Sequence, residues 1–195
     1  MAAVKAVLAS GNRHKLDELR AALPHWELEL LGADDQPEET GATYEENARL
    51  KAAHGRAHAH APGDAWVLGE DSGIECDALA GAPGVRSARW AAPARHADVL
   101  VERLAREQNR RARMVCTIVA LPPEGDEVRA VGALDGEVAH EVRGNAGFGY
   151  DPVFVPRGEV RTVAELGDDW KRANSHRARA ARTLREAVER ERRIP

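Results

Sequence analysis

The stretch VKAVLASGNRHKLDELRAALP, residues 4–24, decides the fold class. A short apolar run ends at Ala9 and breaks at residues 10–12, and leucines then recur at helical spacing until Pro24. This pattern predicts a strand, a tight turn and a helix.

The same alternation of strand and helix continues along the chain. Further strands are expected at residues 28–31, 66–68, 114–121 and 127–142, and further helices at residues 43–60, 97–107 and 173–191. Alternating elements are typical of the α/β class, and the long consecutive strands of the second half predict a mixed central sheet with flanking helices. Because no repeat or linker interrupts residues 1–195, we expect a single domain in which any two lobes share one sheet.

Composition narrows the function classes. A chain of 195 residues with 43% hydrophobic residues is typical of a soluble globular protein, and its net charge of -4 argues against an obligate nucleic-acid coat. The two cysteines, Cys76 and Cys116, have no CxxC or other metal-ligand spacing. There is no apolar run of membrane-span length and no signal-peptide pattern, so the expected location is cytoplasmic, with no membrane partner.

The turn after the first strand carries groups that suit a polyphosphate. Ser10 and Asn12 offer side-chain donors, Lys15 adds a positive charge, and the N–H groups of a helix N-terminus point at the same place. The alternative is an ordinary helix cap followed by a solvated lysine. The P-loop pattern GxxxxGK[ST] is absent.

An acidic segment, Glu70 to Gly73, follows the third strand and is expected to be a turn. Adjacent strand residues point to opposite faces, so only one of Glu70 and Asp71 can face a given cleft. A carboxylate there could hold magnesium or accept a proton from water, or an aspartate could simply cap the turn.

A second acidic pair, Glu38 and Glu39, lies on a loop. Alone it would be a solvated loop. Magnesium prefers one or two carboxylates together with phosphate oxygens and water, and two acidic turns plus one cationic turn would supply that set.

Two later segments could read a base. Phe148 to Asp151 places two aromatic rings between glycines, which suits stacking of a planar ring, although a wedge in the core is the alternative. Lys171 and the segment 175–177 bring a cation and hydrogen-bond donors to the start of the last helix, which could instead be a solvated helix start.

Two other patterns are weaker. His54, His58 and His60 have zinc-like spacing, but no HExxH glutamate accompanies them, and no metal role is expected. A basic run at the last helix, with arginines at positions 172, 177, 179, 182 and 185, is typical of a solvated face. They support a rival interpretation, a nonenzymatic nucleotide- or RNA-binding module.

Six motifs occur in order and nearly span the chain. They are SGNRHK (10–15), EETGATYEENA (38–48), DSGI (71–74), GAPGVRSAR (81–89), GFGYDP (147–152) and SHR (175–177). Together they resemble the inosine triphosphate pyrophosphatase family, which removes deaminated purine nucleotides.

The resemblance implies a two-lobed α/β protein with a central cleft, usually a homodimer, without a stable nucleic-acid partner. It implies a Mg²⁺-dependent enzyme that hydrolyses ITP, dITP and XTP to the nucleoside monophosphate and pyrophosphate. A related pyrophosphatase for pyrimidine or modified nucleotides is the nearer competitor.

The resemblance also implies roles for individual residues. Asp71 would be the catalytic proton acceptor, and Asp71 and Glu39 the metal ligands, with Glu38 as the alternative to Glu39. The implied substrate-binding residues are Ser10, Gly11, Asn12, Arg13, His14, Lys15, Ser72, Phe148, Gly149, Tyr150, Asp151, Lys171, His176 and Arg177.

Three positions depart from the family's usual pattern. Glu70 replaces a common Asp, Trp90 replaces a Tyr, and Asn174 stands where an apolar residue usually precedes Ser-His-Arg. None of these changes removes a proposed catalytic group.

Overall fold

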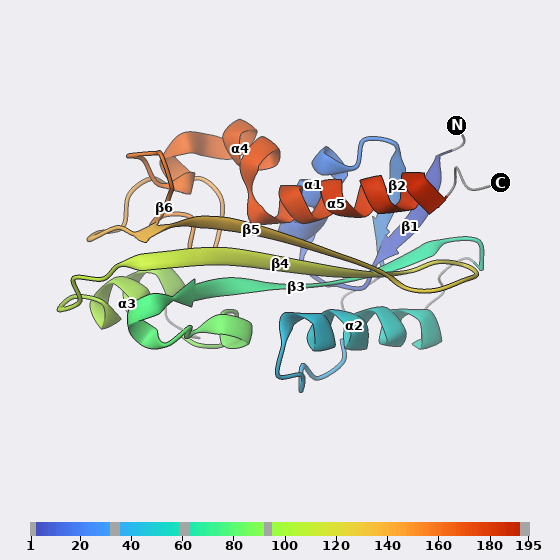
Figure 1. The fold of residues 1–195 in the computed structure, drawn as a ribbon, viewed down its shortest axis with the longest axis horizontal. Coiled ribbons are helices and arrows are strands. Elements are labelled where there is room, and N and C mark those ends of the chain that lie inside the picture. Colours follow the sequence, from blue (N-terminus) through green and yellow to red (C-terminus); the bar gives the residue numbers. More distant parts are fainter. Residues whose placement is uncertain (1–2, 32–35, 59–62, 92–94, 192–195) are drawn as a thin grey trace. The chain divides into compact units, whose positions relative to one another are not determined.

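The computed structural model describes residues 3–31, 36–58, 63–91 and 95–191. In these residues the strands are β1 (Val4–Leu8), β2 (Trp26–Leu30), β3 (Trp66–Cys76), β4 (Arg111–Leu121), β5 (Val128–Val138) and β6 (Phe154–Pro156). The helices are α1 (Arg13–Ala22), α2 (Tyr44–His58), α3 (His96–Arg103), α4 (Val163–Asn174) and α5 (His176–Glu191), with short 3-10 turns at Asp77–Leu79 and Gly84–Arg86 (Figure 1).

The strands form one sheet in the order β2-β1-β3-β4-β5-β6. β1 runs parallel to both β2 and β3, whereas β5 and β6 are antiparallel. The sheet is therefore mixed, with helices beside it, and the predicted α/β class is confirmed.

The chain divides into two compact units. The first holds residues 1–71, 116–132 and 177–195, and the second holds residues 72–115 and 133–176. β3, β4 and β5 each contribute residues to both units. That residues 1–195 make a single domain stays a prediction.

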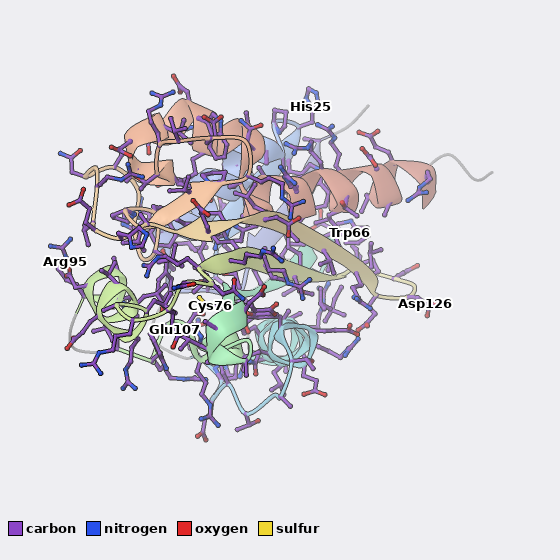
Figure 2. All side chains as sticks on the ribbon, turned by 60° about the vertical axis from the view of Figure 1, so that its left-hand side comes forward. His25, Trp66, Cys76, Arg95, Glu107 and Asp126 are labelled. Carbon is purple, nitrogen blue, oxygen red and sulfur yellow. The ribbon has the colours of Figure 1, made fainter. Side chains whose placement is uncertain are left out.

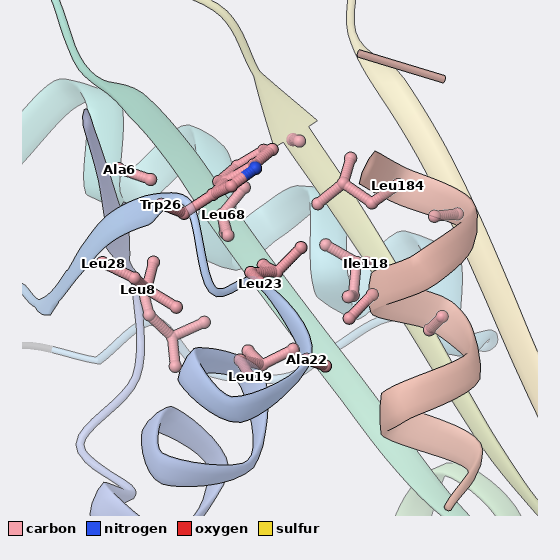
Figure 3. Packing of buried hydrophobic residues seen from close by; sticks show 14 of the residues in the cluster. Ala6, Leu8, Leu19, Ala22, Leu23, Trp26, Leu28, Leu68, Ile118 and Leu184 are labelled. Atoms are coloured by element: carbon pink, nitrogen blue, oxygen red, sulfur yellow. The ribbon is translucent and has the colours of Figure 1, made fainter. Parts of the chain in front are cut away.

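In the first unit, helices cover both faces of the sheet. Leu19 of α1 and Leu184 of α5 belong to one apolar cluster with Ile118 of β4 (Figure 3). Val119, the next residue of β4, packs instead against the alanines of α2. Because neighbouring strand residues point to opposite faces, α1 and α5 lie on one face and α2 on the other.

The second unit has its own apolar cluster. Ile74 of β3 and Leu134 of β5 pack there with Leu100 of α3 and Val163 of α4. Cys76 is buried in the same cluster, and neither Cys76 nor the buried Cys116 forms a disulfide. Charged side chains such as Arg95, Glu107 and Asp126 are exposed, and Arg95 and Asp126 lie at the outer edge of the molecule in Figure 2.

Two predicted elements differ from the structure. The third strand was expected to end at Leu68 and turn at residues 70–73, but β3 continues to Cys76, so the acidic segment lies inside a strand. The buried carboxylates of this segment form ion pairs with residues distant in the sequence, and a local sequence pattern does not reveal such pairs. The expected final helix at 173–191 is present as α5, but it begins three residues later, at His176, because α4 ends at Asn174 and Ser175 is extended.

Other predicted boundaries shift by a few residues. The strand expected at 28–31 occupies 26–30, the helix expected at 97–107 occupies 96–103, and the strand expected at 127–142 occupies 128–138. The expected end of the second helix near His60 lies outside the described residues. Among the described residues, none of the helices combines the length and apolar character needed to cross a membrane.

Candidate active site

Two acidic side chains of the first unit converge on one ammonium group. Asp71, on β3, is 4% exposed, and its Oδ1 lies 2.9 Å from Nζ of Lys51. Glu39, on the loop before α2, forms an ion pair with the same Nζ. The side-chain amide of Asn47 donates a hydrogen bond to the other oxygen of Asp71, Oδ2, at 3.1 Å. Glu39 and Asp71 therefore face a single position at which a cation already sits.

This arrangement fits a magnesium ion of the kind that nucleotide enzymes use. Mg²⁺ is usually held by one or two carboxylates together with substrate phosphates and water. Within residues 3–31, 36–58, 63–91 and 95–191, no three His, Cys, Asp or Glu side chains gather closely enough to hold a metal ion. Glu39 and Asp71 would therefore supply two ligands, and substrate and water the others. His60, one of the zinc-spaced histidines, lies outside the described residues.

The cluster changes the proton affinity of its members. Burial raises the pKa of the Asp71 carboxyl above its ordinary value and outweighs the opposing charge of Lys51. Burial lowers the pKa of Lys51, but the charge of Asp71 and the hydrogen bond to Glu39 more than compensate, so its pKa is raised. Lys51 therefore remains a cation, and Asp71 is a better proton acceptor than an exposed aspartate.

Glu70 points to the opposite face of β3. It is completely buried, its Oε2 lies 2.6 Å from Nζ of Lys15, and its Oε1 lies 3.1 Å from the guanidinium of Arg177. The thiol of Cys116 donates to the same Oε1 at 3.3 Å. Burial alone would raise the pKa of Glu70, but the charges of Lys15 and Arg177 hold it well below its usual range.

Arg177 also pairs with a second carboxylate. Its Nη1 lies 2.9 Å from Oε2 of Glu18, on α1, and the whole side chain is 2% exposed. The interpretation of the arginines near the last helix as a solvated face is therefore wrong for Arg177. The reason is that two buried acids neutralise its charge.

The turn between β1 and α1 is a helix cap with an engaged lysine. Oδ1 of Asn12 accepts from the N–H groups of His14 and Lys15, and Oγ of Ser10 accepts from the N–H of Asn12. The alternative interpretation, an ordinary helix cap followed by a solvated lysine, is therefore half correct. Asn12 caps the helix, but Lys15 is not solvated, since it forms an ion pair with Glu70. Three members of the turn are exposed: Gly11, Arg13 and His14.

The second unit carries a separate cluster. Nζ of Lys171 lies 2.6 Å from Oδ2 of Asp151 and 4.1 Å from the centre of the Phe148 ring. The N–H of Phe148 donates to the same Asp151 oxygen at 2.7 Å. Tyr150 is buried, and its hydroxyl donates to the carbonyl of Ser87, so Tyr150 is part of the core. Phe148 is half-buried and is the accessible aromatic ring of this segment.

The predicted site residues thus fall into both units. The first unit holds residues 10–15, Glu39, Asp71 and Arg177, and the second holds Ser72, residues 148–151, Lys171 and His176. Glu39 and Asp71 come together in the first unit, as do Phe148, Asp151 and Lys171 in the second. Their binding and catalytic roles stay predictions.

The family model described as the Ham1 family matches residues 6–187, nearly the whole chain. This chain belongs to the Ham1 family. The resemblance to a pyrophosphatase family that the six motifs indicate is thereby confirmed.

Two relatives of this Ham1 chain are named dITP/XTP pyrophosphatase. A dITP/XTP pyrophosphatase of Deinococcus deserti is 43% identical over 188 residues, which cover 94% of this chain and 88% of the relative. Another, of Streptomyces coelicolor, is 42% identical over an alignment of 198 positions, which covers 92% of this chain and 94% of the relative.

Solved Ham1 structures share the fold. The Staphylococcus aureus Ham1 protein superposes with a TM-score of 0.83 at 34% identity, over 96% of this chain and 99% of its own. The structure of a nucleoside-triphosphatase/dITP/XTP pyrophosphatase from Mycobacterium abscessus has a TM-score of 0.69 at 39% identity, over 91% of this chain and 96% of its own.

The motifs of this Ham1 chain assigned no role to three residues that the structure places at the charged clusters: Glu18, Asn47 and Lys51. One signal was available in the sequence. Asn47 and Lys51 lie one turn apart on a helix whose other buried residues, Tyr44, Ala48, Ala52 and Gly55, carry no charge, so a lysine there requires an acidic partner.

Proposed function

We propose that this Ham1 chain hydrolyses ITP, dITP and XTP to the nucleoside monophosphate and pyrophosphate. This reaction would remove deaminated purines from the nucleotide pool before they enter DNA or RNA. The observation that carries the proposal is the convergence of Glu39 and Asp71 on one cation position. The relatives at about 40% identity over most of the chain, named dITP/XTP pyrophosphatases, support the substrate class.

The proposed metal is Mg²⁺, held by Glu39 and Asp71. When bound, the ion would neutralise charge on the phosphate oxygens during phosphoryl transfer. Glu39 is the better candidate of the acidic pair because it contacts the Lys51 ammonium together with Asp71, whereas Glu38 is exposed.

Asp71 would act as the base. Its carboxylate accepts a proton from a water molecule, the water oxygen bonds to the α-phosphorus, and the bond from that phosphorus to the bridging oxygen breaks. Pyrophosphate then leaves with the electron pair of the broken bond. The raised pKa of Asp71 suits it for taking this proton.

The phosphates would be bound by the turn of residues 10–15. The N-terminus of α1 and the charge of Lys15 favour an anion there, and Ser10 and Asn12 add polar groups. Glu70 holds the Lys15 ammonium in place, so that the lysine need not be ordered when substrate arrives.

The base would be recognised by the remaining predicted residues. Phe148 offers an aromatic face, while Lys171 and His176 are donors that suit the C6 oxygen of hypoxanthine or xanthine. Arg177, which pairs with Glu18 and Glu70, would have to give up one of these partners to take part. Adenine carries an amino donor at C6 and would leave such groups unmatched, a mismatch that can discriminate by about 10⁴-fold.

A substrate panel tests the proposal. Pyrophosphate release would be measured with ITP, dITP, XTP and the ordinary purine and pyrimidine triphosphates, with and without Mg²⁺. We expect fast, Mg²⁺-dependent release from the deaminated purines only. Preference for pyrimidine nucleotides, or nucleotide binding without any product, would contradict it.

Assembly and location are further parts of the proposal. We expect a homodimer, as the family resemblance implies, and light scattering of the purified chain measures its mass directly. We expect a cytoplasmic location, because that compartment holds the nucleotide pool and because the buried cysteines Cys76 and Cys116 form no disulfide.

A further inference from the structure

Asn47 joins the two proposed metal ligands through one buried amide. The residue lies on α2 and is 0% exposed. Its Oδ1 accepts a hydrogen bond from the N–H of Gly41 at 2.8 Å, and its Nδ2 donates to Oδ2 of Asp71 at 3.1 Å. Gly41 follows Glu39 by two residues, so the amide ties the Glu39 loop to the Asp71 carboxylate.

The loop fits Asn47 closely. A Cβ atom at Gly41 would lie 2.6 Å from Oδ1 of Asn47 and 2.9 Å from its backbone nitrogen. Real Cβ atoms are not found this close to such atoms, so the glycine is what allows the loop backbone to reach the amide. The hydrogen bond at 2.8 Å is the result.

The two oxygens of Asp71 therefore have different partners. Oδ2 faces the neutral amide of Asn47, whereas Oδ1 faces the Lys51 ammonium, which also contacts Glu39. A divalent cation near Oδ1 would repel Lys51 but not an uncharged amide. The Asn47 bond can thus persist when a cation is bound, and it orients Oδ1 toward the position that Glu39 shares.

We propose that Asn47 is a positioning residue that fixes the spacing and orientation of Glu39 and Asp71. It touches neither the nucleotide nor the reacting water. This inference rests on the proposed function, because its consequence is a preorganised pair of ligands for a divalent ion. Partners of metal ligands commonly change metal affinity or activity by about 10- to 100-fold when they are replaced.

The first test replaces Asn47 by a side chain of similar shape without the amide, Asn47→Leu. We expect kcat for ITP to fall by about 10-fold or more, KM to change little, and Mn²⁺ binding without nucleotide, measured by calorimetry, to weaken by about 10-fold. The matched control is Asn109→Leu, since Asn109 is exposed and accepts a hydrogen bond from the nearby backbone N–H of Arg111.

A purely structural role gives a different result. In that case Asn47→Leu lowers the thermal midpoint, while the folded fraction keeps the kcat and the Mn²⁺ affinity of the wild type. That outcome overturns the inference.

A second variant tests the inference even if Asn47→Leu does not fold. Asn47→Asp keeps the oxygen that accepts from Gly41, so the loop stays tied, but it puts a carboxylate oxygen where the donor to Asp71 was. We expect kcat to fall by about 10-fold or more, as in the first variant. Unchanged kcat in folded Asn47→Asp also overturns the inference.

Measurements on the wild type distinguish failure of this inference from failure of the proposed function. If the wild type neither binds Mn²⁺ nor releases pyrophosphate in a metal-dependent way, the proposed function fails. If the wild type does both and the Asn47 variants match it, only the positioning role fails.

Discussion

At the scale of single residues, two adjacent acids have separate environments. Asp71 faces Lys51 and Asn47 on one side of β3, and Glu70 faces Lys15 and Arg177 on the other. The twofold alternation of a strand produces this division without any loop between them. Consecutive carboxylates can therefore serve a proton-accepting cluster and a lysine-positioning cluster.

Asp71→Asn should abolish most turnover. The amide keeps the size of the side chain but accepts no proton at neutral pH, and a general base contributes about 10²- to 10⁴-fold to the rate. We expect kcat for ITP to fall in that range while calorimetry still detects nucleotide binding. Asp126→Asn, at an exposed position, is the control. Near-normal kcat in Asp71→Asn would refute its catalytic role.

Glu70→Gln should destabilise the protein. The substitution leaves Lys15 and the fully buried Arg177 with less opposing charge, and loss of one partner of a buried ion pair costs about 3–5 kcal/mol. Urea unfolding at neutral pH measures the change. Glu107→Gln, at an exposed residue, should leave the unfolding free energy nearly unchanged.

The stability difference between the wild type and Glu70→Gln should depend on pH. The folded state holds the pKa of Glu70 well below its ordinary value, so its contribution is complete above the unfolded pKa of about 4.3 and is lost as the pH falls through the folded value. The difference in unfolding free energy between wild type and Glu70→Gln should therefore shrink on acidification below about pH 4.3. A constant difference would show that the charge of Glu70 is not what stabilises the fold.

At the scale of elements, the close packing of α2 on β3 builds the acidic cluster. Asn47 and Lys51 reach Asp71 only because the helix backbone lies directly against the strand. Gly69 permits this contact, since a Cβ atom there would lie 1.9 Å from the carbonyl oxygen of Ala48. The glycine that precedes the acidic pair is thus a packing requirement of the site.

Gly69→Ala should damage both stability and activity. The added methyl group forces α2 away from β3, and overpacking of this kind costs about 1–3 kcal/mol. We expect a lower urea midpoint and reduced kcat, because Asn47 and Lys51 move with the helix. Gly63→Ala is the matched control, with no atom within 4 Å of its added Cβ and no loss expected. Equal behaviour of the two variants would contradict the packing argument.

At the scale of the whole molecule, the charge distribution disfavours a nucleic-acid partner. The net charge is -4, Arg177 is buried against two acids, and Arg185 lies within ion-pair distance of Glu189 on α5. These observations weaken the rival interpretation of an RNA-binding module.

A binding measurement checks this prediction. In fluorescence anisotropy with single-stranded RNA, we expect no saturable binding at about 0.15 M salt, because too few phosphates would be neutralised. Tight binding with a steep dependence on salt would restore the rival interpretation.

The sequence by itself determined the fold class and the polar residues of the six motifs. Alternating strand and helix patterns depend on local periodicity, and residues 4–24 contain a complete strand, turn and helix. The order of six motifs is equally visible in one dimension, so Asp71, Glu39 and Lys15 could be named without coordinates.

Only the tertiary structure decided how those residues are held. Asn47 and Lys51 meet Asp71 across 24 and 20 positions of sequence, and Arg177 meets Glu70 across 107. Acidic and small residues at 70–73 locally favour a turn, yet β3 continues through them because distant cations neutralise the buried charges. Such pairings depend on which elements pack together, and local patterns in the chain carry no information about that.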